Sequence, residues 1–321
     1  MDIIIGKKIR DNNKEVSDST IRSYVLNIKK ILELLGIKDI KELEIFYKDY
    51  KKVILKIKEE YSNSSHSQRN KMTACNALIK SLKDGKNDKK IDKALIEYIK
   101  EIKLLRNMIE EQLDTHEKTE KEEESWLTKK DIKLILKGLK DKVPEDIDSL
   151  EDLSKLRDYV IFLFYNSVPS RNDVAMAKFY DMDEIDIDDI KKDKLLNYII
   201  LDKDDKKVYY IMNNYKTVKK HNSQTLDLGN ELYDVLRDYK EKMKVFNEED
   251  WFLLSNKGKH ISTNSLSIIY SKLGSVIGKK TSIRTNRHIK VSENVDMSKV
   301  KVLARLMGHD VSTALNIYAK K

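Results

Sequence analysis

Five short stretches in the second half of the sequence each carry a residue type that suits phosphate chemistry. They contain Arg171 ("SVPSRNDV"), Lys216 ("YKTVKK"), Arg284 ("TSIRTNRHIK"), His309 ("LARLMGHD") and Tyr318 ("STALNIYAKK"). An arginine presents a planar fork that matches two phosphate oxygens, and a tyrosine hydroxyl can attack as a nucleophile. Lysine and histidine can transfer protons. Together these side chains have what is needed to break a phosphodiester bond through a covalent intermediate.

Each residue alone has an ordinary explanation, so the hypothesis depends on the ordered set. Arg171 follows an apolar helix and would otherwise cap it or form an ion pair. Lys216 is one of 63 basic residues, and a single lysine is usually surface charge. Tyr318 could simply anchor a terminal helix. What favours a shared site is the order of all five residues, with strand-like sequence around the lysine only.

In this order the stretches resemble the motifs of the tyrosine recombinases, also called the phage integrase family. The family has "TGLRxSELxxLxxxDID", a "KT" hairpin, "HxxRH", "LLGH" and "TxxIY", and the interval from His309 to Tyr318 also fits. The resemblance implies that Tyr318 attacks the scissile phosphate and becomes a 3′-phosphotyrosine, while Arg171 and Arg284 hold the non-bridging oxygens. It also implies that Lys216 protonates the leaving 5′ oxygen. His309 would bind the phosphate or relay the tyrosine proton.

The sequence departs from the family pattern at several positions. Thr281 stands where "HxxR" usually begins with His or Lys. An offset alignment makes Arg287, which a histidine follows, the second arginine; we prefer Arg284 because "SIR" copies the apolar–Arg pair with fewer gaps. Lys219 and Lys220 are rivals for the catalytic lysine, since hairpin registers are poorly fixed by sequence. Thr281, Arg287 and Lys219 are therefore possible auxiliary residues.

Charge predicts a nucleic-acid partner. The chain has a net charge of +9, and its last 51 residues hold 11 lysines and arginines against three acidic residues. Basic side chains that neutralise phosphates supply most non-specific DNA affinity. The candidate DNA-binding residues are Arg22, Lys29, Arg69, Lys71, Lys279 and Lys280. No metal or other cofactor is expected, because the sequence shows no carboxylate cluster or Gly-rich phosphate loop.

Hydrophobic spacing predicts a mainly α fold of two domains with one small antiparallel sheet. Apolar residues recur at helical spacing through residues 1–113, which resemble the helical core-binding domain of the family. Residues 114–125, "DTHEKTEKEEES", hold six acids and two lysines with no apolar residue, and they are expected to be an exposed linker, with a polar helix extension as the alternative. Residues 126–321 form the predicted α+β catalytic domain, with antiparallel strands within 197–228 after an exposed insertion near 184–197.

The expected function is a site-specific DNA recombinase or integrase that clamps duplex DNA between the two domains, without metal or ATP. The expected assembly is a homotetramer on DNA. Two alternatives stay open: a type IB topoisomerase, and a recombinase-like DNA-binding protein that no longer cuts. Cys75 is the only cysteine, which excludes a disulfide framework within one chain. With no long apolar run either, the expected location is the cytoplasm or nucleoid, with no membrane partner.

Overall fold

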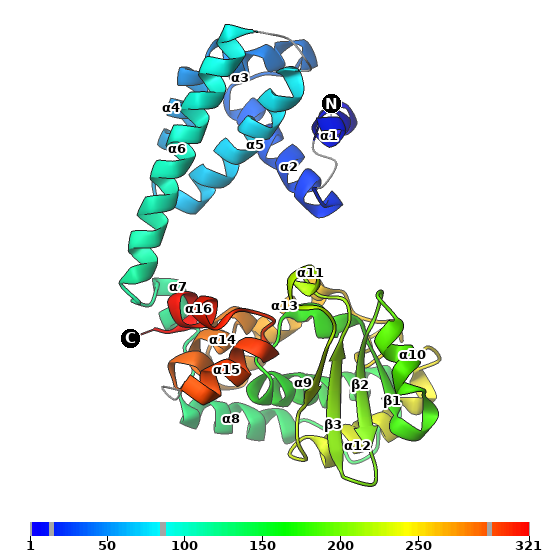
Figure 1. Ribbon diagram of the computed structural model, residues 1–321. Coiled ribbons are helices and arrows are strands. Elements are labelled where there is room, and N and C mark those ends of the chain that lie inside the picture. Colours follow the sequence, from blue (N-terminus) through cyan, green and yellow to red (C-terminus); the bar gives the residue numbers. More distant parts are fainter. Residues whose placement is uncertain (1, 13–15, 84–87, 294–296, 321) are drawn as a thin grey trace. The chain divides into compact units, whose positions relative to one another are not determined.

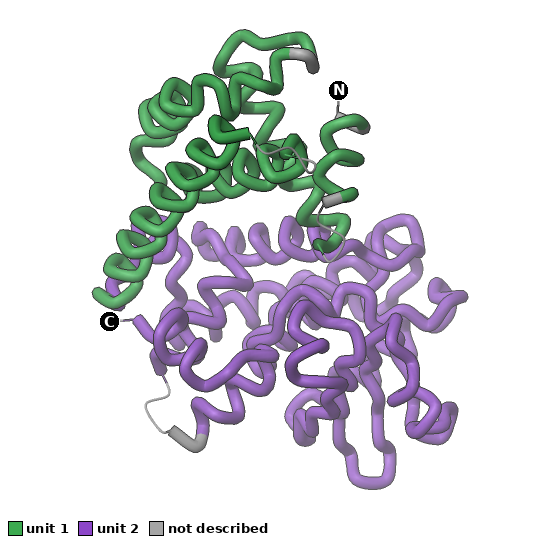
Figure 2. The backbone as a smooth tube through the Cα atoms, turned by 45° about the horizontal axis from the view of Figure 1, so that its top comes forward, with its two compact units in different colours: residues 1–115 green, residues 116–321 purple. Residues whose placement is uncertain are grey.

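The computed structural model describes residues 2–12, 16–83, 88–293 and 297–320. They divide into two compact units, Met1–Thr115 and His116–Lys321 (Figure 2). Each unit has a hydrophobic core of its own.

Helices build the first unit (Figure 1). They are α1 (Asp2–Asn12), α2 (Asp18–Leu34), η1 (Ile40–Glu44), α3 (Ile45–Lys48), α4 (Tyr50–Glu60), α5 (Ser65–Lys83) and α6 (Lys89–Asp114). Helix α2 shows why these segments are helical. Ile21, Val25 and Ile28 fall on one buried face, and the side chain of the N-cap Ser17 accepts a hydrogen bond from the backbone of the first turn. Gly36, with φ +71°, ends the helix.

The acidic stretch 114–125 differs from the exposed linker that its composition predicts. Asp114 is the last residue of α6, and Glu120–Glu124 form helix α7. Thr119 and Glu122 form a capping box at its start, and Glu122 is only 6% exposed. A carboxylate that caps its own helix keeps its hydrogen bonds when buried, so composition alone could not reveal this burial.

The second unit is mostly helical and holds the sheet. After α7 it contains α8 (Lys129–Lys140), α9 (Leu150–Ser167), η2 (Asn172–Met176), β1 (Ala177–Asp181), η3 (Met182–Glu184), α10 (Ile187–Lys192), β2 (Asn197–Asp202), β3 (Lys207–Met212), α11 (Val218–His221), β4 (Gln224–Asp227), α12 (Tyr233–Met243), η4 (Lys244–Phe246), α13 (Thr263–Leu273), η5 (Gly274–Ile277), α14 (Ile283–Ser292), α15 (Met297–Leu306), α16 (Val311–Thr313) and η6 (Ala314–Tyr318). The mainly α fold class with one small sheet is confirmed.

The sheet is mixed rather than purely antiparallel. Its strand order is β1-β2-β3-β4, and the pairings of β2 with β3 and β3 with β4 are antiparallel as expected. Strand β1 pairs with β2 in parallel. The physical reason is the insertion, which forms α10 and crosses over between β1 and β2, because parallel neighbours need such a crossover. The insertion is not wholly exposed either, since Ile190 is buried against Tyr198 and Ile200 of β2.

Helix α9 is the scaffold of the site. Its apolar residues, including Phe162, Phe164 and Tyr165, lie in the main core of the second unit. Tyr165 and Tyr270 of α13 pack edge to face with ring centroids 5.3 Å apart. The buried Asn286 of α14 donates a hydrogen bond to the Tyr165 carbonyl at 2.6 Å. Helix α14 is therefore fixed to the end of α9 from which the first candidate arginine follows.

Candidate active site

Arg171 joins three segments of the second unit. It is the N-cap residue of η2, just beyond α9. Its Nη1 donates to Thr217 Oγ1 at 3.3 Å, and its Nη2 lies 3.2 Å from both ring nitrogens of His309. Thr217 Oγ1 in turn donates to the carbonyl of Gly308 at 2.7 Å. The loop between β3 and β4, the end of α15 and the end of α9 thus meet at one point.

Tyr318 completes this cluster. Its hydroxyl lies 3.0 Å from His309 Nε2 and accepts a hydrogen bond from Arg287 Nη1 at 3.1 Å. The ring lies near two imidazoles, with centroids 4.9 Å from His288 and 5.3 Å from His309. Tyr318 is 8% exposed, so its packing and both hydrogen bonds fix the direction of the hydroxyl.

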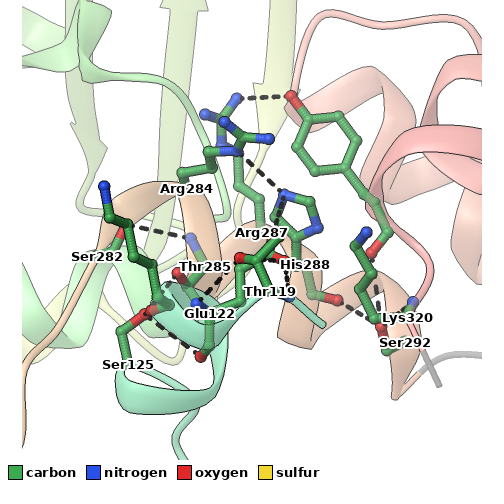
Figure 3. Close-up of polar contacts among 12 residues, drawn as sticks. Thr119, Glu122, Ser125, Ser282, Arg284, Thr285, Arg287, His288, Ser292 and Lys320 are labelled. Atoms are coloured by element: carbon green, nitrogen blue, oxygen red, sulfur yellow. Dashed lines mark hydrogen bonds and ion pairs between the residues drawn. The ribbon is translucent and has the colours of Figure 1, made fainter. Parts of the chain in front are cut away.

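Arg287 contacts the Tyr318 hydroxyl, and this contact favours Arg287 over Arg284, the residue preferred from the sequence, as the second arginine of the cluster. Both residues are on α14, three positions apart, and so project from nearby directions. Arg284 is exposed, and its Nε lies 3.4 Å from His288 Nε2 (Figure 3). Arg287 turns inward to the tyrosine hydroxyl. In this register Arg284 occupies the first position of the "HxxR" pattern, so a cation is present there after all.

Thr281 lies outside the cluster. It is 4% exposed, and its hydroxyl donates to the backbone carbonyl of Tyr270. Thr281 packs closely against Gly274: a Cβ added at Gly274 would lie 2.7 Å from Thr281 Cγ2. The side chain of Thr281 is thus part of the core. The predicted auxiliary role of Thr281 is therefore withdrawn.

The candidate lysines lie in the loop between β3 and β4. Lys216 is exposed and directly precedes Thr217, which binds Arg171. Lys219 is also exposed, on α11. Lys220 forms an ion pair with Asp310. Lys216 is thus next to the cluster, while Lys220 already has an acidic partner.

Burial and positive charge set the electrostatics of the cluster. Burial, then the neighbouring Arg171 and Arg287, lower the pKa of His309 to about 4, so the imidazole is neutral at pH 7. Burial also lowers the pKa of Arg287 and raises that of Asp173, which faces both arginines and Lys216. A neutral imidazole can accept a proton from Tyr318, and two partly buried arginines suit an anionic ligand.

His288 and Glu122 are site residues that the sequence analysis did not propose. His288 is 1% exposed at its side chain, and its Nε2 lies 3.5 Å from Glu122 Oε1 (Figure 3). Burial, opposed by Glu122, lowers the pKa of His288 to about 4. The signal for His288 was its place directly after Arg287 in "RH". Glu122 had none, because it lies within an acidic stretch.

Gly308 allows His309 to reach the cluster. Its φ of +61° is in the left-handed region, and an added Cβ would lie 2.9 Å from Tyr215 Cε2. Both facts require glycine at this position. The close approach lets the chain pass the Tyr215 ring, and the next residue then projects toward Arg171.

The candidate DNA-binding residues have different surroundings. Lys71 is 6% exposed with its Nζ 3.7 Å from the centre of the Tyr61 ring, so this prediction is corrected: the residue packs inside the first unit. Lys279 pairs with Asp131 and Lys280 with Glu124, each at 2.7 Å. The side chains of both lysines remain exposed or partly exposed, as do those of Arg22, Lys29 and Arg69.

Arg69 lines a polar groove of about 540 Å³ in the first unit. Helices α2, α5 and α6 form its walls. Its lining residues are Ser19, Thr20, Ser23, Tyr24, Asn27, Arg69, Asn70, Thr73, Ile102 and Arg106. Hydroxyl, amide and guanidinium groups are the side chains that bind phosphates and base edges.

Among residues 2–12, 16–83, 88–293 and 297–320, no group of three His, Cys, Asp or Glu side chains is arranged to hold a metal ion. Within the same described ranges, no helix has the length and apolar content needed to cross a bilayer.

The chain is similar to solved recombinase structures over nearly its whole length. One is XerA recombinase, with 15% identity, a TM-score of 0.40, and coverage of 99% of this chain and 93% of that chain. Another is XerH site-specific recombinase bound to difH substrate in a pre-cleavage complex, with 13% identity, a TM-score of 0.47, and coverage of 98% and 91%. No protein-family model and no curated protein matches the sequence. At these identities the likeness assigns no role to any residue of this chain.

Proposed function

We propose that this protein is a tyrosine recombinase that cleaves and rejoins DNA through a 3′-phosphotyrosine intermediate. The observation that carries the proposal is the position of the Tyr318 hydroxyl, 3.1 Å from Arg287 Nη1 and 3.0 Å from His309 Nε2. Arg171 binds the same histidine at 3.2 Å. A potential nucleophile, a neutral base and two arginines thus share one small volume.

In the proposed cleavage step, Tyr318 Oη attacks the phosphorus while the bond from phosphorus to the 5′ oxygen breaks. The tyrosine proton passes to His309 Nε2, and Lys216 gives a proton to the departing 5′ oxygen. Arg171 and Arg287 bind the non-bridging oxygens, where negative charge grows in the transition state. The phosphotyrosine ester conserves the free energy of the broken bond, so a 5′ hydroxyl can attack its phosphorus, release Tyr318 and reseal the strand without ATP.

We propose that the groove in the first unit is one surface that contacts DNA. Arg69 and Arg106 would neutralise phosphates, and Asn27 and Asn70 have the donor and acceptor pair that reads adenine. Lys71 has no part in this surface because it is buried. Exchange between two duplexes requires four strand cleavages, so we further propose that four copies act together on DNA.

Covalent trapping tests the proposal without knowledge of the target sequence. The protein is mixed, in EDTA, with a pool of randomised duplexes that carry a single nick. Where the nick is close to the scissile bond, the short product diffuses away and the adduct accumulates. We expect protein attached to a 3′ DNA end, and sequencing of the trapped DNA then gives the site.

Two variants make this test specific. Tyr318→Phe should bind the pool and form no adduct, because only the hydroxyl is removed. Tyr209→Phe, a tyrosine of β3 outside the cluster, should react like the wild type. Equal adduct from wild type and Tyr318→Phe would disprove the assignment of the nucleophile. Sequence-independent relaxation of plasmids by monomeric protein would instead indicate a topoisomerase.

A further inference from the structure

We propose that residues 116–125, hereafter the brace, hold the nucleophile in place, and that Glu122 is a positioning residue which acts on Tyr318 through His288. The inference deepens the proposed function and rests on it for the role of Tyr318. The brace directly follows α6, the last helix of the first unit, yet it belongs to the second unit.

The residues after Tyr318 are fastened to the brace. His116 Nδ1 donates to the carbonyl of Ala319 at 3.0 Å, and Lys320 Nζ donates to the carbonyl of Glu117 at 3.1 Å. His116 has a φ of +54°, a left-handed conformation that is uncommon outside glycine. The chain therefore turns at His116 with its side chain directed to the tail, and a local strain is maintained where the brace begins.

Helix α14 holds the same tail from its other side. Ser292 Oγ accepts a hydrogen bond from the backbone N–H of Lys320 at 2.8 Å and donates to the carbonyl of His288 at 2.8 Å (Figure 3). The helix that carries Arg287 and His288 and the segment that carries Tyr318 are thus joined through one hydroxyl. The backbone just after Tyr318 is thereby attached to α14 within this chain.

Helix α7 ties the brace to α14. Ser125 Oγ and Thr285 Oγ1 lie 2.8 Å apart and are both buried. Glu122 Oε2 accepts from the backbone N–H of Thr119 at 2.9 Å and from its hydroxyl at 3.0 Å. A helix of five residues is unstable alone, so the contacts with α14 maintain it. The brace and α14 are therefore joined by buried hydrogen bonds.

Glu122 is the residue of the brace that acts on the nucleophile. Its Oε1 lies 3.5 Å from His288 Nε2, and the His288 ring packs on the Tyr318 ring. Nε2 donates to Glu122 in one tautomer and accepts from Arg284 in the other, so the ring stays between them in both. Burial opposes the charge of Glu122, but the hydrogen bonds from the Thr119 backbone and hydroxyl outweigh it and lower the pKa of Glu122. A buried carboxylate with these contacts is costly to displace.

The test measures the tail directly as well as the chemistry. Glu122→Gln keeps the shape of the side chain and removes its charge, and Ser292→Ala removes the hydroxyl that joins the tail to α14. Glu124→Gln is the matched control for the first, since Glu124 is on α7 and pairs with the exposed Lys280. Ser271→Ala is the control for the second, because its hydroxyl donates to the Ile268 carbonyl within α13.

We expect both test variants to speed hydrogen exchange of the amides in 311–320 by about tenfold, with exchange in α9 unchanged. On DNA already bound at saturation, adduct formation should slow by about ten- to a hundredfold, which is the loss of one or two buried polar contacts. DNA affinity should change by less than about threefold. A merely structural role would instead alter exchange in α9 and thermal stability.

The outcomes separate the two proposals. Unchanged exchange of the tail in both variants would overturn the brace, whatever the activity. Faster exchange with normal adduct formation would overturn the positioning role of Glu122. Absence of any adduct from the wild type would overturn the proposed function, while the exchange measurement would still decide whether the brace holds the tail.

Discussion

Replacement of Arg287 should impair cleavage far more than replacement of Arg284. Arg287 is partly buried, and its Nη1 already binds the Tyr318 hydroxyl at 3.1 Å. Its buried Nε has no hydrogen-bond partner among the described residues. A desolvated guanidinium with a free N–H has capacity for an anion, and a phosphate oxygen would satisfy it. Arg284 is exposed, and its Nε contact with His288 is long at 3.4 Å.

The expected magnitude follows from these contacts. A hydrogen bond to a charged group contributes about 1.5–3 kcal/mol, so loss of a two-bond fork to the phosphorane costs about 3–6 kcal/mol. That corresponds to a decrease of about 10²- to 10⁴-fold in the rate of adduct formation for Arg287→Ala. Arg284→Ala should slow the same step by about tenfold or less, because an exposed contact contributes about 1 kcal/mol at most.

The assay is a single-turnover measurement of adduct formation, with DNA held above the dissociation constant of each variant. Arg287→Lys separates charge from geometry: it should bind DNA normally and still lose most of the rate, because an ammonium cannot form the fork. Thermal unfolding checks that each variant is folded. Equal rates for Arg287→Ala and Arg284→Ala, or a larger loss for Arg284→Ala, would refute the assignment of Arg287.

Three further predictions concern the surroundings of the site. In the DNA-free protein, His309 should titrate near pH 4 by NMR, because burial lowers its folded pKa below the unfolded value of about 6.5. The stability that the neutral imidazole contributes is therefore lost as the pH falls from about 6.5 through 4. A titration midpoint near 6.5 would contradict the burial argument. Gly308→Ala should reduce the free energy of unfolding by about 1–3 kcal/mol in denaturant titrations, owing to its left-handed φ and the approach of Tyr215, and an unchanged value would count against that geometry. Lys71→Met should leave DNA affinity within about threefold. Arg69→Ala should weaken binding and reduce the slope of log affinity against log salt concentration by about one. The reverse pattern in titrations at several salt concentrations would exclude the groove as a DNA surface.

Much of the fold was predictable because its signals are local. Thr128 is the N-cap of α8, as its position before an apolar period predicts, and it forms a capping box with Asp131. Gly36 ends α2 through its left-handed φ. By contrast, β1 was not predicted, since it is five residues long and its partner β2 follows only after α10. Its pairing depends on a distant crossover rather than on its own sequence.

The site was predicted in outline, but not which of two neighbouring arginines belongs to it. Arg284 and Arg287 are three residues apart on one helix, so pattern matching cannot tell which one faces the core. The contact of α14 with α9 through Asn286 decides this, and that contact is tertiary. The burial of Lys71 and Glu122 escaped prediction for the same reason. A charged side chain is rarely buried without a partner. Lys71 is buried against the Tyr61 ring, and Glu122 is buried with the hydrogen bonds of Thr119.

The brace also determines where this chain can be cut. A catalytic fragment that begins at Trp126, where the acidic stretch ends, would omit His116, Glu117 and Glu122 and with them the contacts to Ala319, Lys320 and His288. A fragment that begins at His116 would retain them. The functional boundary of the second unit therefore lies at His116, before residue 126, where composition places it. A catalytic fragment has to include the brace.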